Sequence, residues 1–387
     1  MSSRMGRRGA IFLSVCAAIA LTLTGGRLAQ AGLQWSRHAG LGKVLTTSGG
    51  GQVFGYDIDR SGNFGMLATA NNIQEFDQTT GAIVKVFPAR TPQNTTYGFD
   101  GIFNKDAGLV VRYVEARGSF NAIRHYDVVS PLTAGGFTGE WTPPVRDIDI
   151  QAAGSQQQAK TVILAFERGP QRNGIDLFTS DVAANTFGNV FRLDANTFCE
   201  CFGPQLGAFL AANQAVIALS PDGGTVGGRA PINYVVDLTT GQIAQFNGFN
   251  NGPFHAGYVN GMAMDPATGV EVTTTELNAQ VEFYNVGTRS GITAVQLPCT
   301  GNADQSNSGA GIGFDPVNKL FLVSDPSYAC DGGRDGAVVV YDEAGNLVES
   351  ISGFKFFIAE PGAVVNPHTR VGWMFGPGFG NLQQFFY

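Results

Sequence analysis

Phe76-Asp77-Gln78-Thr79-Thr80-Gly81 is the stretch that decides the fold, because shorter versions of it return along the chain. An Asp side chain accepts hydrogen bonds from the backbone of a turn, and Gly supplies the positive φ that closes a hairpin. Five further copies begin at intervals of 50, 54, 56, 48 and 57 residues; they are Tyr126-Asp127, Ser180-Asp181, Val236-Asp237-Leu238-Thr239-Thr240-Gly241, Tyr284-Asn285 and Tyr341-Asp342-Glu343-Ala344-Gly345.

A second polar turn precedes each copy and is flanked by apolar runs typical of strands. Its examples are Asp59-Arg60-Ser61-Gly62, Asn104-Lys105-Asp106-Ala107-Gly108, Ser220-Pro221-Asp222-Gly223, Asp265-Pro266-Ala267-Thr268-Gly269, Asp315-Pro316-Val317-Asn318 and Asn366-Pro367-His368-Thr369. Pro presets φ for such a turn, and Gly or Asn completes it. Each repeat is therefore predicted to be two hairpins. Four antiparallel strands at a period of about fifty residues indicate one blade of a β-propeller.

The Ser-Pro-Asp-Gly and Asp-x-Thr-Thr-Gly turns resemble those of bacterial β-propellers of the YVTN and SMP-30 class. The resemblance covers essentially the whole chain after residue 31. It implies a propeller scaffold and says little about activity, because these turns belong to the scaffold rather than to a site.

The number of blades follows from the two ends of the repeat series. Six complete copies are followed by a seventh, from about Phe357 to Tyr387, that lacks its fourth strand. Residues 33–46 are strand-like and belong to no copy. Placed as the missing strand, they would remove an open sheet edge with unpaired backbone groups. We therefore predict an all-β, seven-bladed β-propeller with four antiparallel strands per blade, closed by the N-terminal strand; six or eight blades, or two β-sandwiches, are the alternatives.

Residues 1–31 are predicted to be a secretory signal peptide, and residues 32–387 the propeller domain. Arginines 4, 7 and 8 precede an apolar run that ends before Ala29-Gln30-Ala31, a small-x-small cleavage pattern. An uncleaved anchor is the alternative. The expected location is secreted or periplasmic. Removing residues 1–31 takes away four arginines and no acid, so the net charge of −7 becomes about −11. This balance disfavours nucleic acid as a partner, and no later apolar run is long enough to span a membrane.

Long, non-repeating loops are expected on one face, which we predict to be the binding face, and all four cysteines after residue 31 fall in these loops. Cys299 and Cys330 lie in adjacent loops, and we predict a disulfide between them. Cys199 and Cys201 could form a strained ring, bind a metal or stay reduced. The predicted export favours disulfides over free thiols.

The most enzyme-like stretch begins at His255 and includes Asn260-Gly261. It resembles the SMP-30 lactonase pattern, in which an Asn at the channel mouth helps to hold a divalent cation. Glu276, Asp100 and Glu360 could add carboxylates, and oxygen ligands suit calcium or magnesium. The plainer interpretation is an ordinary turn from loop to strand. Two arginines of the same face, Arg117 and Arg334, are candidates for binding an anionic group.

The leading functional hypothesis is an exported, non-catalytic propeller that binds a small-molecule or protein ligand through these loops. It depends on the lack of a complete catalytic constellation: the sequence has no Gly-x-Ser-x-Gly and no His-x-x-x-His grouping. The alternative is a divalent-cation-dependent lactonase or related hydrolase, similar to SMP-30, acting at the central channel. A structural component of a larger envelope assembly is a third possibility. The sequence does not name the ligand.

Overall fold

The computed structural model describes residues 39–60, 62–69, 72–88, 96–97, 101–104, 109–116, 123–129, 134–141, 148–155, 160–167, 174–181, 186–194, 204–211, 214–219, 232–237, 239–246, 259–275, 280–298, 311–325, 335–355, 362–378 and 380–387. Between residues 96 and 234 it describes the backbone only. The described residues form strands and turns and contain no helix, so none of them belongs to a helix that could cross a membrane.

The described strands form seven antiparallel sheets, which we number in chain order. Sheet 1 consists of β2(Val53–Ile58), β3(Phe64–Thr69), β4(Asn72–Asp77) and β5(Ile83–Pro88). Sheet 2 consists of β6(Thr96–Tyr97), β7(Gly101–Asn104), β8(Leu109–Ala116), β9(Ile123–Val129) and β10(Ala134–Trp141). Sheet 3 consists of β11(Ile148–Ser155), β12(Lys160–Glu167), β13(Gly174–Asp181) and β14(Thr186–Asp194). In sheet 2 the first strand is in two pieces, since both β6 and β7 pair with β8.

Sheets 4 to 7 follow the same plan. Sheet 4 consists of β15(Pro204–Ala211), β16(Gln214–Leu219), β17(Ile232–Asp237) and β18(Ile243–Phe246), and sheet 5 of β19(Val259–Asp265), β20(Val270–Thr275), β21(Gln280–Asn285) and β22(Ser290–Gln296). Sheet 6 consists of β23(Ile312–Asp315), β24(Leu320–Asp325), β25(Gly336–Asp342) and β26(Leu347–Phe354). Sheet 7 consists of β27(Val364–Asn366), β28(Val371–Phe375) and β29(Asn381–Phe386) together with β1(Gly40–Thr46). The predicted all-β class and antiparallel four-stranded sheets are thus confirmed.

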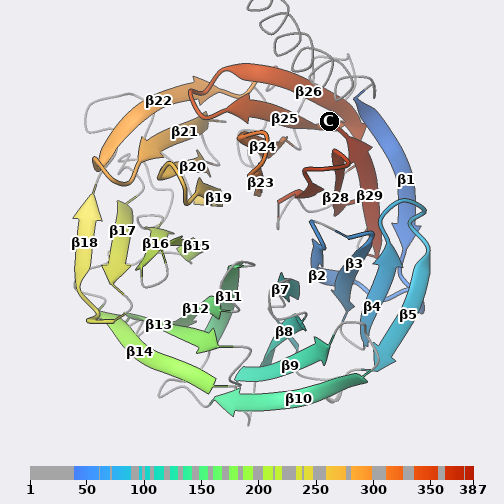
Figure 1. The fold of residues 1–387 in the computed structure, drawn as a ribbon, viewed down its shortest axis with the longest axis horizontal. Helices are drawn as coiled ribbons and strands as arrows, with labels where there is room; N and C mark the ends of the chain where they lie inside the picture. The colour runs from blue at the N-terminus through green and yellow to red at the C-terminus, as the bar shows by residue number, and fades with distance from the viewer. Residues whose placement is uncertain are drawn as a thin grey trace, which may run out of the picture.

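The first strands of successive sheets lie next to one another around a common centre (Figure 1). The later strands of each sheet lie progressively farther out, and β27 of sheet 7 lies beside β2 of sheet 1. In this arrangement a sheet packs against the sheets that precede and follow it around the centre.

Sheet 7 combines strands from the two ends of the described chain. Strand β1 pairs antiparallel with β29, from Gly40 opposite Phe386 to Thr46 opposite Asn381, with an irregular register between Leu41 and Val44. The Thr47 amide also donates to the Gly380 carbonyl at 2.9 Å. These contacts join segments more than 300 residues apart in sequence.

The Asp turns of sheets 1 and 4 form as the sequence predicts. Oδ1 of Asp77 accepts from the amides of Thr79 and Thr80 at 2.9 and 2.7 Å, and Gly81 follows with φ 69°. In sheet 4, Asp237 accepts from the amides of residues 239 and 240 at 2.8 and 2.9 Å, and Gly241 has φ 73°. Each of these turns connects the third strand of a sheet to the fourth.

One predicted turn is wrong. The sequence placed Ser220-Pro221-Asp222-Gly223 between the first two strands of sheet 4. The structure reverses the chain at residues 212–213, where Ala211 pairs with Gln214, so residues 220–223 follow the second strand instead. The reversal at 212–213 carries neither the Pro nor the Gly on which the prediction relied, whereas residues 220–223 carry both.

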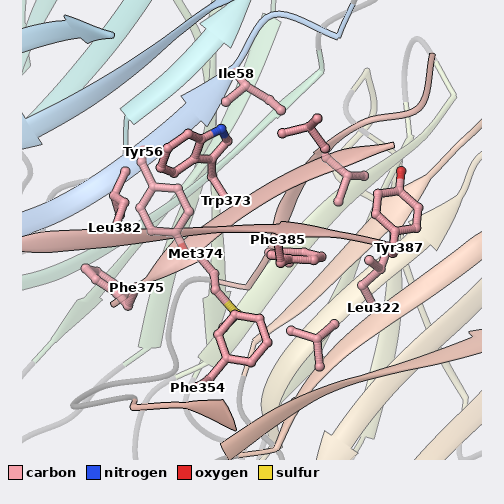
Figure 2. Packing of buried hydrophobic residues seen from close by; sticks show 14 of the residues in the cluster. Tyr56, Ile58, Leu322, Phe354, Trp373, Met374, Phe375, Leu382, Phe385 and Tyr387 are labelled. Carbon is pink, nitrogen blue, oxygen red and sulfur yellow. The ribbon is translucent and has the colours of Figure 1, made fainter. Parts of the chain in front are cut away.

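Aromatic side chains fill the space between the sheets. Figure 2 shows the cluster formed by sheets 1, 6 and 7, in which Trp373 and Phe385 are completely buried. Trp373 meets Phe76 edge-on with ring centroids 5.1 Å apart, a favourable aromatic geometry. A second cluster fills the boundary between sheets 5 and 6, with Phe283 and Phe321 at its centre. Sheet-to-sheet packing of this kind holds the scaffold rigid.

Candidate functional site

The sheets have two different edges. We call the edge where first strands begin and second strands end the loop edge, and the opposite edge the turn edge. In the order of the chain, the sequence-predicted site residues belong to segments that adjoin the loop edge, except Asp100, which falls between β6 and β7. Asn260 lies in β19, although its side chain is not described. The others lie outside the described residues: His255, Glu276, Asp100, Glu360, Arg117, Arg334, Cys299 and Cys330.

Asn260 and Glu276 belong to neighbouring strand ends. Val259 pairs with Thr275 and Gly261 with Thr274, so Asn260 occupies an irregular step of the β-bulge kind, and Glu276 directly follows Thr275. Bulges often re-aim side chains beside active sites. Asp100, by contrast, falls between β6 and β7, the two pieces of the first strand of sheet 2, and Glu360 precedes β27, the first strand of sheet 7. Strand order does not join these four positions into one cluster.

The cysteines predicted to pair adjoin neighbouring sheets. Cys299 follows the last strand of sheet 5, and Cys330 lies between β24 and β25 of sheet 6. Both fall outside the described residues, so the disulfide stays a prediction.

Gln74 organises the loop edge between sheets 7 and 1. Its Oε1 accepts from the Ser48 amide at 2.8 Å, and its Nε2 donates to the Ser48 carbonyl at 3.0 Å. The same Nε2 donates to Oδ1 of Asn72 at 2.7 Å, and the hydroxyl of Thr69 donates to that oxygen at 2.8 Å. Gln74 is completely buried. This part of the loop edge is therefore fixed by hydrogen bonds within the scaffold.

The first strands of sheets 6 and 7 approach each other too closely for side chains between them. A Cβ on Gly313 would lie 2.0 Å from the Ala363 carbonyl oxygen, and one on Gly362 would lie 2.4 Å from the Ile312 nitrogen. The Tyr56 hydroxyl, from sheet 1, donates to the Gly362 carbonyl at 3.0 Å. Glycine is required here because backbone meets backbone.

Side chains at the turn edge clamp adjacent sheets. Lys319 of sheet 6 forms an ion pair with Asp265 of sheet 5, and the Thr268 hydroxyl donates to Glu343 at 2.7 Å. Burial tends to raise the pKa of Asp265, but the bond from Lys319 and the turn hydrogen bonds lower it overall. Because these side chains bind one another across the two sheets, we infer that the turn edge has a structural role.

The most unusual chemistry lies within sheet 5. Glu271 of β20 and Glu282 of β21 are both completely buried, and so is Thr273, which pairs with Glu282. Glu271 pairs with Tyr284, whose hydroxyl donates to Oε2 of Glu282. No hydrogen-bond partner of the Glu271 carboxyl is found among the described residues. Sequence reasoning missed this pair; the signal was a Glu in each of two strands that the propeller architecture covers on both faces.

Burial raises the pKa of Glu271 to about 8, and the charge of Glu282 adds to the effect. The pKa of Tyr284 is raised as well, mainly by burial and then by Glu282. Within the described residues, no group of three or more His, Cys, Asp or Glu side chains could hold a metal ion. The arrangement can therefore hold or release a proton in a dry environment.

Comparisons with known proteins identify the fold. No family model matches the chain, and no curated protein matches its sequence. Two solved structures are similar to it: "Structure of U3-55K", with a TM-score of 0.63 and 11% identity, covering 89% of this chain and 98% of that one, and "Crystal structure of RRP9 WD40 repeats", with a TM-score of 0.62 and 11% identity, covering 89% and 96%. At this identity the likeness concerns architecture alone, and it shows that the chain has a β-propeller fold.

Proposed function

We propose that the protein is an exported, non-catalytic propeller that binds a protein or small-molecule ligand through its loop edge. The observation that carries this proposal is the contrast between the two edges. Turn-edge connections are short and hydrogen-bonded within themselves, as at 78–82, 266–269 and 343–346. The loop edge carries the longer connections 247–258, 297–311 and 326–335. Variable loops on a rigid scaffold are where binding residues usually occur.

We further propose that the seven sheets are seven blades of one closed ring, as in the bacterial YVTN and SMP-30 class. The pairing of β1 with β29 and the position of β27 beside β2 support closure. A disulfide at Thr46→Cys and Asn381→Cys, which are directly opposite each other, tests it. We expect the oxidised variant to keep its native spectrum and to unfold at higher denaturant concentration than its reduced form. Failure to oxidise in the folded state would contradict closure.

Site-specific photocrosslinking tests the binding proposal. A photoreactive residue is placed at Arg117 or Arg334 on the loop edge, and at Val317 on the turn edge as a control, since Val317 is 52% exposed. The exported protein is irradiated in its own envelope fraction. We expect a discrete adduct from the loop-edge positions alone. Equal adducts from Val317, or adducts from Val317 only, would overturn the assignment of the binding face.

A cation-dependent lactonase similar to SMP-30 is the second candidate, and the bulge at Asn260 beside the Glu276 position favours it. Metal analysis of the purified protein separates the two functions. Stoichiometric calcium or magnesium that is lost in Asn260→Ala, together with lactone hydrolysis lost in the same variant, would establish the enzyme. Protein without bound metal and without hydrolysis supports the binding function.

A further inference from the structure

We propose that Glu271 is held as a neutral acid between sheets 4 and 5, and that loss of its proton loosens the contact between these sheets. The site is independent of the loop edge. It is formed by the face of sheet 5 that the apolar cluster with sheet 6 does not use.

The register shows which way Glu271 points. Val270 and Val272 pack in the cluster shared with sheet 6. Because neighbouring residues of a strand face opposite sides, Glu271 and Thr273 face the other way. Strand β15 of sheet 4 lies beside β19 on that side (Figure 1). Glu271 is completely buried, so this side is covered.

Among the described residues of sheet 5, none on this face brings a positive charge to Glu271. On sheet 5, its pairing partner in β19 is Met264 and its partner in β21 is Tyr284, whose hydroxyl already donates to Glu282. Strand β22 places Ala294 opposite Glu282 and Gly291 opposite Tyr284.

The described strands of sheet 4 contain no Lys, Arg or His, and their titratable residues are Tyr234 and Asp237. Asp237 accepts hydrogen bonds from its own turn. A carboxylate buried without a cation is strongly disfavoured, and the second buried carboxyl of Glu282 adds to the cost, so protonating Glu271 removes the conflict. The pKa of about 8 for Glu271 agrees with this account.

The consequence for stability has a definite sign. The pKa of Glu271 in the folded protein lies above its ordinary value of 4.5. Between about pH 4.5 and about pH 8 the folded state therefore holds a proton that the unfolded state has released. The stabilisation is fully present below pH 4.5 and is lost as the pH rises to about 8. The unfolding equilibrium constant is expected to rise by up to tenfold per pH unit in this window.

Infrared spectroscopy of the unmodified protein tests the protonation state directly. At pH 6.5 we expect a protonated carboxyl C=O band that disappears by pH 9.5, and we expect Glu271→Gln to lack it. Absence of the band at pH 6.5 overturns the proposal, and this measurement does not depend on whether the variant folds.

Hydrogen exchange, corrected for the intrinsic pH dependence, tests the loosening. Between pH 6.5 and 9 we expect protection to fall in peptides covering β15 and β19 of the natural protein, and to stay unchanged in Glu271→Gln. Glu75→Gln is the control, because Glu75 is a partly exposed glutamate opposite Lys85 in sheet 1, and it should behave as the natural protein does. Protection in β15 and β19 that falls equally in Glu271→Gln would overturn the proposal. A loss of stability towards low pH that disappears in Glu271→Gln would also overturn the proposal, because it would mean that Glu271 is ionised and pairs with a basic group outside the described residues.

Discussion

Sheets 5 and 6 place different chemistry at corresponding positions of the same face. In sheet 6 the second residue of the second strand is Phe321, which pairs with Tyr341 and packs against sheet 5. In sheet 5 that position is Glu271, which pairs with Tyr284 and faces sheet 4. The next pair on this face is Val323 with Val339 in sheet 6, and Thr273 with Glu282 in sheet 5. One boundary is thus apolar and the other acidic.

Two further sheets show what this position requires. In sheet 1 it is Gly65 opposite Phe76, and in sheet 7 it is Gly372 opposite Phe385. In both, the aromatic ring lies over the glycine, and a Cβ would lie within 2.3 Å of it. Gly and Phe both fill the position without charge. In these four sheets the residue on the third strand is aromatic, and sheet 5 alone among them has a carboxyl on the second strand.

A large-to-small substitution in the apolar boundary between sheets 5 and 6 should have the largest effect on the unfolding free energy. Phe321→Ala removes a completely buried ring whose centroid lies 4.7 Å from that of Phe314 and 6.2 Å from that of Phe283. We expect a loss of about 3–5 kcal/mol of unfolding free energy, because the cavity cannot collapse between two rigid sheets. Denaturant unfolding measures it. Val317→Ala, at an exposed site in the same sheet, should change stability by less than about 0.5 kcal/mol; a similar loss in both variants would contradict the assignment of the core.

Making the acidic boundary apolar should have an intermediate effect of opposite sign. Glu271→Leu replaces a buried acid with a side chain of similar size, and we expect a gain of about 1–3 kcal/mol at pH 8. The gain should be smaller at pH 5, where the acid is neutral. Unfolding at the two pH values measures the difference, with Glu75→Leu as the matched control. Equal gains at both pH values would show that the protonation of Glu271 does not contribute to the pH dependence of the unfolding free energy.

The smallest effect is expected at the turn edge of the same boundary. Lys319 has φ 57°, a left-handed conformation that favours glycine, and its side chain pairs with Asp265 across the two sheets. Lys319→Gly relieves the backbone and removes a partly exposed ion pair, and each contributes about 1 kcal/mol or less. We expect a net change within about 0.5 kcal/mol. A loss above 2 kcal/mol would show that the ion pair, rather than the aromatic cluster, holds sheets 5 and 6 together.

Local sequence signals predicted the scaffold well. The Asp77 and Asp237 turns depend on residues within four positions of one another, so their chemistry is visible without the fold. The reversal between Ala211 and Gln214 was missed because Asn213 is its only residue typical of turns, whereas residues 220–223 carry both Pro and Gly. The sequence could assign the site only to a group of loops, because its residues come from segments far apart in the chain, and that assignment stays a prediction.

Glu271 was missed for a different reason. The run Val270-Glu271-Val272-Thr273 has the alternation of a strand with one face in solvent. In a propeller both faces of a sheet are covered, so the polar face becomes buried. That change depends on the neighbouring sheet, which no local pattern shows.

The pairing of β1 with β29 has a consequence for biogenesis. The ribosome makes β1 before every other described strand and β29 after all of them, so sheet 7 gains its outer strand only when synthesis has passed Phe386. Contacts between such distant segments form slowly, because a very long loop must close first. Premature termination or proteolytic trimming anywhere before β29 would leave β1 without its partner. The pairing thus makes synthesis of β29 a condition for the completion of sheet 7.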